Sequence, residues 1–246
     1  MVRLLRSLGG FLAERKLEPA LLEIAGTPVV LTFRRHPKAR RLIIRAARDG
    51  KSFSLTLPPR ASRKEAIAFA ERSRLWIAGR LSKTPAAIPF APGSIIPLRG
   101  IGHVIIHCPG ARGSVWRDGE TINVAGNPAH LARRLRDWLK LEARRDFLAA
   151  SERYAQAMET RFSRLSVRDQ SSRWGSCSAG GNLSYSWRLI FAPAFVLDYV
   201  AAHEVGHLRH MDHGPRYWRL VLTRCPHAGE ARHWLRRHGA GLHRYG

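Results

Sequence analysis

The chain has 246 residues, of which 45% are hydrophobic, a composition that is typical of globular proteins and excludes an intrinsically disordered chain. Its 42 lysine and arginine residues outnumber 18 aspartate and glutamate residues, so the formal net charge of +24 favours polyanionic partners such as nucleic acid. Three cysteines without a CxxC pair exclude a disulfide-based scaffold and favour a reducing cytoplasm.

An N-terminal arm, residues 1–26, is expected to precede the folded part of the chain. It contains several arginines, but Glu14, Glu18 and Glu23 interrupt it and no long apolar run follows. A signal peptide or a membrane anchor needs such a run. The sequence therefore predicts a soluble, cytoplasmic protein without a membrane partner.

A β-rich lobe is predicted over residues 27–125. Large apolar residues recur at every second position over residues 29–33, which is typical of a strand with one buried face. Residues 42–46 and 53–57 have strand composition and flank Asp49-Gly50, a dipeptide typical of hairpin turns. The sequence therefore predicts a β-sheet at the start of this lobe.

One helix and further strands are expected in the same lobe. Ser62 precedes Glu65 by three positions, a capping box that opens a helix with apolar residues at helical spacing as far as Leu81. Residues 85–100 are rich in proline and glycine and are expected to form a connector. Further strands are predicted on both sides of Asp118-Gly119.

A helical lobe is predicted over residues 126–240. A long helical pattern covers residues 128–158 and a shorter one covers residues 193–209. The intervening residues 165–189 are β-like, and a turn is expected at Gly175. No internal repeat or low-complexity tract is evident. Strands followed by helices predict an α+β fold, with a β-rich half before a helical half.

The strongest chemical signal is an HExxH pattern inside the shorter of these helices. Residues four positions apart share a helix face, so the imidazoles of His203 and His207 can point at one metal ion. Glu204 would lie beside that ion without binding it, where a carboxylate can take a proton from a zinc-bound water. The alternative is that both histidines are ordinary helix residues, and a third ligand would decide between the two interpretations.

The third ligand has several candidates. His210 lies near the same helix face, but it is about 10 Å along the axis from His203, too far for one ion. His213 follows in a turn-forming run that ends the helix and can return a side chain to the ion. Its spacing matches that of metzincins, yet His210 replaces their glycine and no methionine follows Met211, so that class is disfavoured. Glu230, from a later helix, ranks below His213.

Three blocks of sequence resemble the YgjP-like metallopeptidases, a family related to the SprT-like proteases. The blocks are Ser172–Ser178 with Ser186–Ile190 and Ala192-Pro193, then His203–Leu208 with His213–Trp218, and, more weakly, Arg40-Arg41-Leu42 with Trp76-Ile77. The resemblance as a whole covers roughly residues 27–240. Ser186 and Val205 stand where the family often has asparagine and leucine or isoleucine, and neither position is a ligand.

This resemblance implies a zincin-like fold over the helical lobe. It also implies one Zn²⁺ ion per chain, bound by His203, His207 and His213, with Glu204 as the catalytic residue. The function predicted is that of a zinc metallopeptidase that hydrolyses peptide bonds, with Glu204 activating a zinc-bound water. The resemblance leaves the protein or peptide substrate open.

Three further residues are candidates for supporting roles at this site. Tyr217 and Arg173 are candidates for stabilising the anionic transition state because they lie within the motifs, although packing beside Trp218 is the favoured alternative for Tyr217. Asp198 is expected either to orient a ligand imidazole or to be a plain surface carboxylate. Cys177 is expected to be a small buried residue rather than an additional ligand.

A second hypothesis starts from the net charge. The protein would be a basic, nucleic-acid-associated protein whose zinc site acts near DNA or is only structural. A third hypothesis is a zinc-bearing scaffold without activity. Glu204 argues against that scaffold, because a structural zinc site needs no general base and closes its fourth position.

Overall fold

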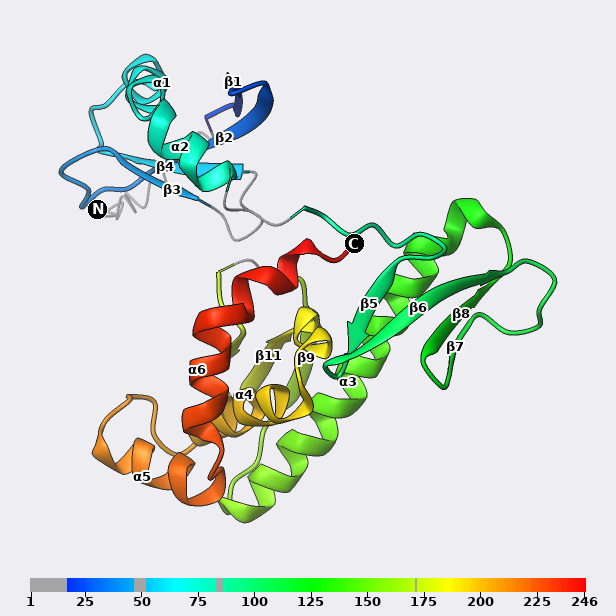
Figure 1. The fold of residues 1–246 in the computed structure, drawn as a ribbon. Coiled ribbons are helices and arrows are strands. Elements are labelled where there is room, and N and C mark those ends of the chain that lie inside the picture. The colour runs from blue at the N-terminus through cyan, green and yellow to red at the C-terminus, as the bar shows by residue number, and fades with distance from the viewer. Residues whose placement is uncertain (1–16, 47–51, 83–85, 171) are drawn as a thin grey trace, which may run out of the picture. The chain divides into compact units, whose positions relative to one another are not determined.

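The computed structural model describes residues 17–46, 52–82, 86–170 and 172–246. The chain divides into two compact units, Met1–Thr84 and Pro85–Gly246. Sheets dominate the first half and helices the second, so the fold is α+β, as the sequence predicted (Figure 1). No helix among the described residues combines the length and the apolar character that a bilayer crossing requires.

The first unit contains a four-stranded sheet and two helices. Its elements are β1 (Ala20–Ile24), β2 (Thr27–Arg35), β3 (Ile43–Ala46), β4 (Ser52–Leu57), α1 (Arg63–Arg72) and α2 (Arg74–Leu81). The strand order is β1-β2-β4-β3, with β2 parallel to β4 and the two outer pairs antiparallel. Every second residue of β4 is buried, namely Phe53, Leu55 and Leu57, so one face of the sheet forms a core.

The first unit differs from the sequence expectations in two places. Residues 20–24 of the expected arm form β1, which pairs with β2, while the arm up to residue 16 and the Asp49-Gly50 turn lie outside the described residues. The single predicted helix is two helices, although its capping box at Ser62 and Glu65 is present. The break is at Ser73, whose hydroxyl donates to the carbonyl of Phe69 at 2.8 Å and so competes with regular helical bonding.

A second four-stranded sheet opens the second unit. It consists of β5 (Ile95–Leu98), β6 (Ile101–Cys108), β7 (Val115–Asp118) and β8 (Thr121–Ala125). The order is β5-β6-β8-β7, again with a parallel central pair and antiparallel outer pairs. The two sheets therefore share one topology, although no repeat was evident in the sequence. Strand β5 lies within the stretch expected to be only a connector.

The second sheet packs against the long helix α3 (Leu131–Ala157), which follows a short 3₁₀ turn, η1 (Pro128–His130). Asn127 caps this turn with its side-chain oxygen, 2.8 Å from the Ala129 nitrogen. Buried residues of both elements, among them Ile122, Val124 and Leu135, belong to one core. This packing places the division between the units at Thr84 and Pro85 rather than at residues 125 and 126, where the sequence changes from β-rich to helical.

The remaining elements of the second unit form a small sheet and a group of helices. They are β9 (Arg164–Arg168), β10 (Gly175–Cys177), β11 (Asn182–Ser186), η2 (Trp187–Phe191), α4 (Ala194–Gly206), α5 (Pro215–Arg224), α6 (Ala228–His238) and η3 (Gly239–Arg244). The sheet order is β10-β11-β9, so β10 is an edge strand. Gly175, expected to form a turn, is the first residue of β10.

Helix α4 lies between α3 and α6 and is buried on nearly every side (Figure 1). The turn between β5 and β6 contacts the residue that directly precedes α4. Gly100 approaches Pro193 so closely that a Cβ atom would lie 3.0 Å from the Pro193 Cα atom. Beside it, the Arg99 guanidinium donates to Asp146 at 2.7 Å and to Glu142 at 2.9 Å, both on α3. Helix α4 is therefore fixed from several directions.

Candidate metal centre

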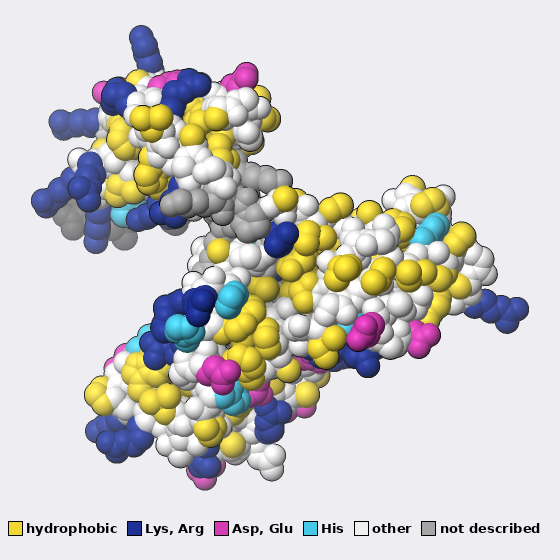
Figure 2. All heavy atoms as spheres, in the orientation of Figure 1, with side chains coloured by type: hydrophobic (Ala, Val, Ile, Leu, Met, Phe, Trp, Pro, Cys, Tyr) yellow, Lys and Arg dark blue, Asp and Glu magenta, His cyan; other side chains and the backbone are white. Residues whose placement is uncertain are grey.

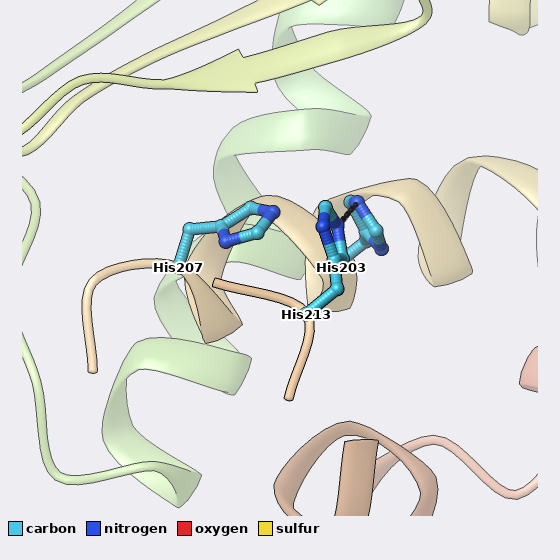
Figure 3. Close-up of side chains that lie close together, drawn as sticks. All are labelled: His203, His207 and His213. Carbon is cyan, nitrogen blue, oxygen red and sulfur yellow. Dashed lines mark hydrogen bonds between the residues drawn. The ribbon is translucent and has the colours of Figure 1, made fainter. Parts of the chain in front are cut away.

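Three imidazoles converge at the end of α4, and Figure 3 shows their rings together. His203 is in the last turn of α4, His207 is the residue directly after it, and His213 comes from the loop before α5. One nitrogen of each ring lies within 4.8 Å of the corresponding nitrogens of the other two. The helix supplies two of the rings because they are one turn apart, and the loop returns the third.

The spacing of these nitrogens fits a zinc ion. The Nε2 atoms of His203 and His213 are 3.2 Å apart. Two nitrogens that bind one tetrahedral zinc ion at its usual bond length lie about 3.3 Å from each other. His203, His207 and His213 could therefore hold one zinc ion together.

Hydrogen bonds of His203 leave its Nε2 atom free for a metal. The Tyr217 hydroxyl lies 2.6 Å from His203 Nδ1 and 3.0 Å from the His203 carbonyl oxygen. Because that hydroxyl has one proton to donate to the carbonyl, it accepts the proton on Nδ1, and Nε2 carries none. The Tyr199 hydroxyl is also 3.3 Å from Nδ1. This arrangement selects the tautomer that a metal needs.

His207 is oriented in the same way. Its Nδ1 atom lies 3.0 Å from the His210 carbonyl oxygen, to which it donates a proton. His210 therefore takes part through its backbone, and its side chain is not in the three-histidine group. Burial, with the neighbouring imidazoles, lowers the pKa of His203 to about 3, and burial also lowers the pKa of His207. Both rings are neutral at pH 7, the form in which imidazole binds metals.

Tyr217 reaches His203 because α5 packs closely against the end of α4. At Gly206, a Cβ atom would lie 2.8 Å from a methyl carbon of Val221 and 3.1 Å from the Tyr217 ring. The ring of Tyr217 stacks on His207, with centroids 4.6 Å apart and an interplanar angle of 22°. Tyr217 is also in edge contact with Trp218, the packing that the sequence favoured. In this structure its hydroxyl positions a histidine.

Glu204 follows His203 directly in α4, and its side chain points toward the edge strand β10. Its side chain is buried, and a Cβ atom on Gly175 would lie 2.5 Å from Glu204 Oε1. Burial raises the pKa of Glu204 to about 8, although the charge of Arg173 lowers it. The carboxyl therefore exchanges its proton near neutral pH, as a general acid–base group requires.

Glutamine at position 204 is expected to stabilise the metal-free protein in a pH-dependent way. Below pH 4.5 the carboxyl is protonated in both the folded and the unfolded chain, and toward pH 8 only the unfolded chain ionises readily, so wild-type stability falls. Glu204→Gln removes this loss, which amounts to roughly 2–4 kcal/mol by pH 8. Urea unfolding with a chelator at about pH 5 and about pH 8 measures it. An equal effect at both pH values would contradict the assignment.

The other predicted residues lie farther from the three histidines. Asp198 contacts Tyr154, Arg153 and His227, whereas the Nδ1 contacts of His203 are to tyrosines, so the predicted orienting role of Asp198 has no support in these contacts. Glu230 is exposed in the first turn of α6 and is not in the three-histidine group.

Arg173 and Cys177 both interact electrostatically with Glu204. Arg173 is exposed, and its charge acts on the pKa of Glu204. Burial and the charge of Glu204 raise the pKa of the Cys177 thiol to about 11, so that thiol is neutral at pH 7. Cys177 is half-buried and does not belong to the three-histidine group.

Sequence reasoning missed Tyr199 and the roles of Gly175 and Gly206. A glycine inside a helix costs about 1 kcal/mol relative to alanine, so Gly206 was a detectable sign of close packing. Gly175 gave no such sign, because glycine is also common in turns. Tyr199 precedes His203 by one helical turn, and that spacing could have identified it.

Comparison with known proteins gives three findings. A family model described as YgjP-like, metallopeptidase domain, matches residues 40–238. No curated protein sequence matches the chain. The crystal structure of the metallopeptidase zymogen of Pyrococcus abyssi abylysin is similar over 35% of this chain and 87% of its own, with 18% sequence identity and a TM-score of 0.32. A structural likeness this low carries no argument.

Proposed function

Since the chain belongs to the YgjP-like metallopeptidase family, we propose that it hydrolyses peptide bonds at the three-histidine centre, with zinc as its metal. One observation carries this proposal: three imidazole nitrogens lie within 4.8 Å of one another, and the buried carboxyl of Glu204 directly follows the first of these histidines in α4. A structural site would need no such carboxyl.

The proposed zinc ligands are His203, His207 and His213. Bound zinc lowers the pKa of a water molecule and polarises a carbonyl group. The protein holds two of the imidazoles ready for this task through Tyr217 and the His210 carbonyl. Removing such an outer hydrogen bond typically weakens metal binding 10–100-fold.

Glu204 is the proposed general base and acid. Its carboxylate takes a proton from the attacking water and later passes it to the amine of the leaving peptide. In the metal-free chain burial raises the pKa of Glu204 to about 8, and the charge of a bound zinc ion would lower it and favour the carboxylate that the first transfer needs. Arg173, whose charge reaches Glu204, is the remaining candidate for stabilising negative charge on the substrate.

Nucleic acid remains a predicted partner on the basis of charge. Figure 2 shows lysine and arginine side chains around the first unit. The exposed basic residues from β2 to β3 include Arg34, Lys38, Arg40, Arg41 and Arg45. Binding through such residues should weaken steeply as salt is added, and an absence of binding at low salt would contradict this partner.

Replacement of His213 by alanine tests the metal centre. The purified His213→Ala protein should contain one equivalent of zinc less than the unaltered chain, because it loses a ligand from an exposed loop position. It should also lose hydrolysis of an unfolded protein such as casein. Zinc analysis of the desalted proteins and a casein assay measure both effects.

His210→Ala is the matched control for that experiment. Its side chain is outside the three-histidine group, and its carbonyl oxygen, which His207 uses, survives the substitution. Zinc content and hydrolysis should therefore stay close to those of the unaltered chain. An equal loss in both variants, or zinc retention by His213→Ala, would contradict the proposed ligand set.

A further inference from the structure

A second group of metal-binding side chains lies on another side of α4. Asp198 belongs to α4, Cys225 ends α5 and His227 precedes α6. Their ligand atoms all lie within 4.8 Å of one another. Asp198 is five positions before His203, which places it about 140° around the helix axis from that residue. The group is therefore separate from the three-histidine centre.

The Asp198 carboxylate and the Cys225 sulfur both approach the same imidazole nitrogen of His227. His227 Nε2 is 3.0 Å from Asp198 Oδ2 and 3.3 Å from Cys225 Sγ. That nitrogen carries at most one proton, so it cannot make a full hydrogen bond to both neighbours. A cysteine–histidine–aspartate catalytic triad would instead use different ring nitrogens for the thiol and the carboxylate. The convergence of sulfur, nitrogen and oxygen on one point is the geometry of a metal site.

The surrounding residues hold these donors in place. The Tyr154 hydroxyl donates to Asp198 Oδ2, and Arg153 contacts the other carboxylate oxygen, Oδ1. The ring of Phe195 meets His227 edge-on, with centroids 6.2 Å apart. These contacts come from α3 and α4 and restrict the carboxylate and the imidazole, as the outer contacts of metal ligands usually do.

The connection between α5 and α6 restricts the other donor. Cys225 has a non-helical backbone, with φ of −132° and ψ of 82°, and Pro226 follows it. Proline disfavours the helical conformation in the residue before it, so α5 ends here, and the sulfur and the imidazole two positions later lie on the same short segment. Two ligands separated by one rigid residue need little reorganisation to bind an ion.

A cavity gives access to the group. It has a volume of about 430 Å³, and its lining includes Asp198, His227 and Phe195. Cys225 is fully buried behind these residues. An ion that enters the cavity would meet the carboxylate and the imidazole first and the sulfur last, so a path for entry exists.

We propose that Asp198, Cys225 and His227 form a second metal site, which binds a zinc-type divalent ion and ties α4 to the connection between α5 and α6. A sulfur, a nitrogen and an oxygen donor together favour zinc or cobalt over magnesium or calcium, which prefer oxygen alone. This site does not depend on the proposed peptidase activity.

Cobalt binding tests the site directly, because a thiolate bound to Co²⁺ gives an intense near-ultraviolet charge-transfer absorption that imidazole ligands do not give. Titration of the full-length, metal-free chain with CoCl₂ should produce this band and saturate at about two ions per chain. If the unaltered protein shows no thiolate band at saturation, the three side chains form only a hydrogen-bonded network, and the proposal is overturned.

Variants assign the band to Cys225. Cys225→Ser and Asp198→Asn should each bind about one cobalt ion per chain, at the three-histidine centre, and neither should give the thiolate band. Cys177→Ser and Cys108→Ser should keep the full band. Loss of the band in either variant would show that the bound thiolate comes from that cysteine and not from Cys225. His213→Ala should keep the band while losing the other ion, so failure of the three-histidine centre would be distinguishable. Circular dichroism establishes that each variant is folded.

Discussion

Glu204→Gln is expected to slow peptide hydrolysis strongly but measurably while leaving the metal in place. Glutamine has nearly the same shape as glutamate but cannot accept a proton, and general acid–base catalysis by one side chain typically contributes 10²–10⁴-fold. His203, His207 and His213 are unchanged in this variant, so its zinc content should equal that of the unaltered chain. The measurement is the turnover of a fluorescence-quenched peptide substrate by both proteins at equal zinc content.

The matched control for that variant is Glu230→Gln, in which an exposed glutamate of α6 is replaced in the same way. Its turnover should be unchanged. A fall in turnover that came only from the loss of a negative charge would appear in both variants. Undiminished hydrolysis by Glu204→Gln, in a preparation free of other peptidases, would rule out Glu204 as the base.

Gly175→Ala is expected to reduce hydrolysis by about 10- to 100-fold, although residue 175 has no catalytic group. The added Cβ atom would lie 2.5 Å from Glu204 Oε1, 2.7 Å from Cγ and 2.8 Å from Cδ, so the carboxyl must move. Gly175 is not among the residues with positive φ, and alanine therefore adds no backbone strain of that kind. Turnover should fall while zinc content stays constant.

Two comparisons isolate this effect. At Gly180, the nearest atom to an added Cβ is Asn182 Nδ2 at 3.6 Å, so Gly180→Ala should leave turnover unchanged. The double variant with Glu204→Gln should be no slower than Glu204→Gln alone, because both changes act on the same group. If Gly175→Ala lowers turnover further in that background, its effect does not pass through Glu204.

The sequence identified the helix that carries HExxH because a helix start at Pro193 and the motif agreed on it. Its end was expected near Arg209, whereas α4 ends at Gly206 and His207 is the cap residue. The close packing of α5 at Gly206 involves residues that are distant in sequence, Tyr217 and Val221. A local pattern records spacing along one helix and not the approach of another.

The proposed role of Asp198 shows a similar limit. Five positions before His203, it was a candidate partner for a ligand, and the same spacing turns it about 140° around the helix. Helical geometry alone could have warned against that role. The sequence could not have brought Asp198 together with Cys225 and His227, because their meeting depends on how α5 and α6 fold back on α4.

The glycine of the edge strand was also misplaced by local reasoning. Gly175 was expected to form a turn, and it is the first residue of β10. Glycine in a strand often marks the close approach of another group, here the carboxyl of Glu204. Without a partner in view, the turn and the strand interpretations have the same sequence signature.

Separate hydrophobic cores in the two units have a consequence for how this protein melts. Among the described residues, no buried core residue belongs to both clusters, so the chain need not unfold in a single cooperative step. The chain has 7 tryptophans, and Trp76 is the one within Met1–Thr84. Intrinsic fluorescence therefore reports mainly on the unit that contains Glu204, whereas calorimetry would sum two transitions.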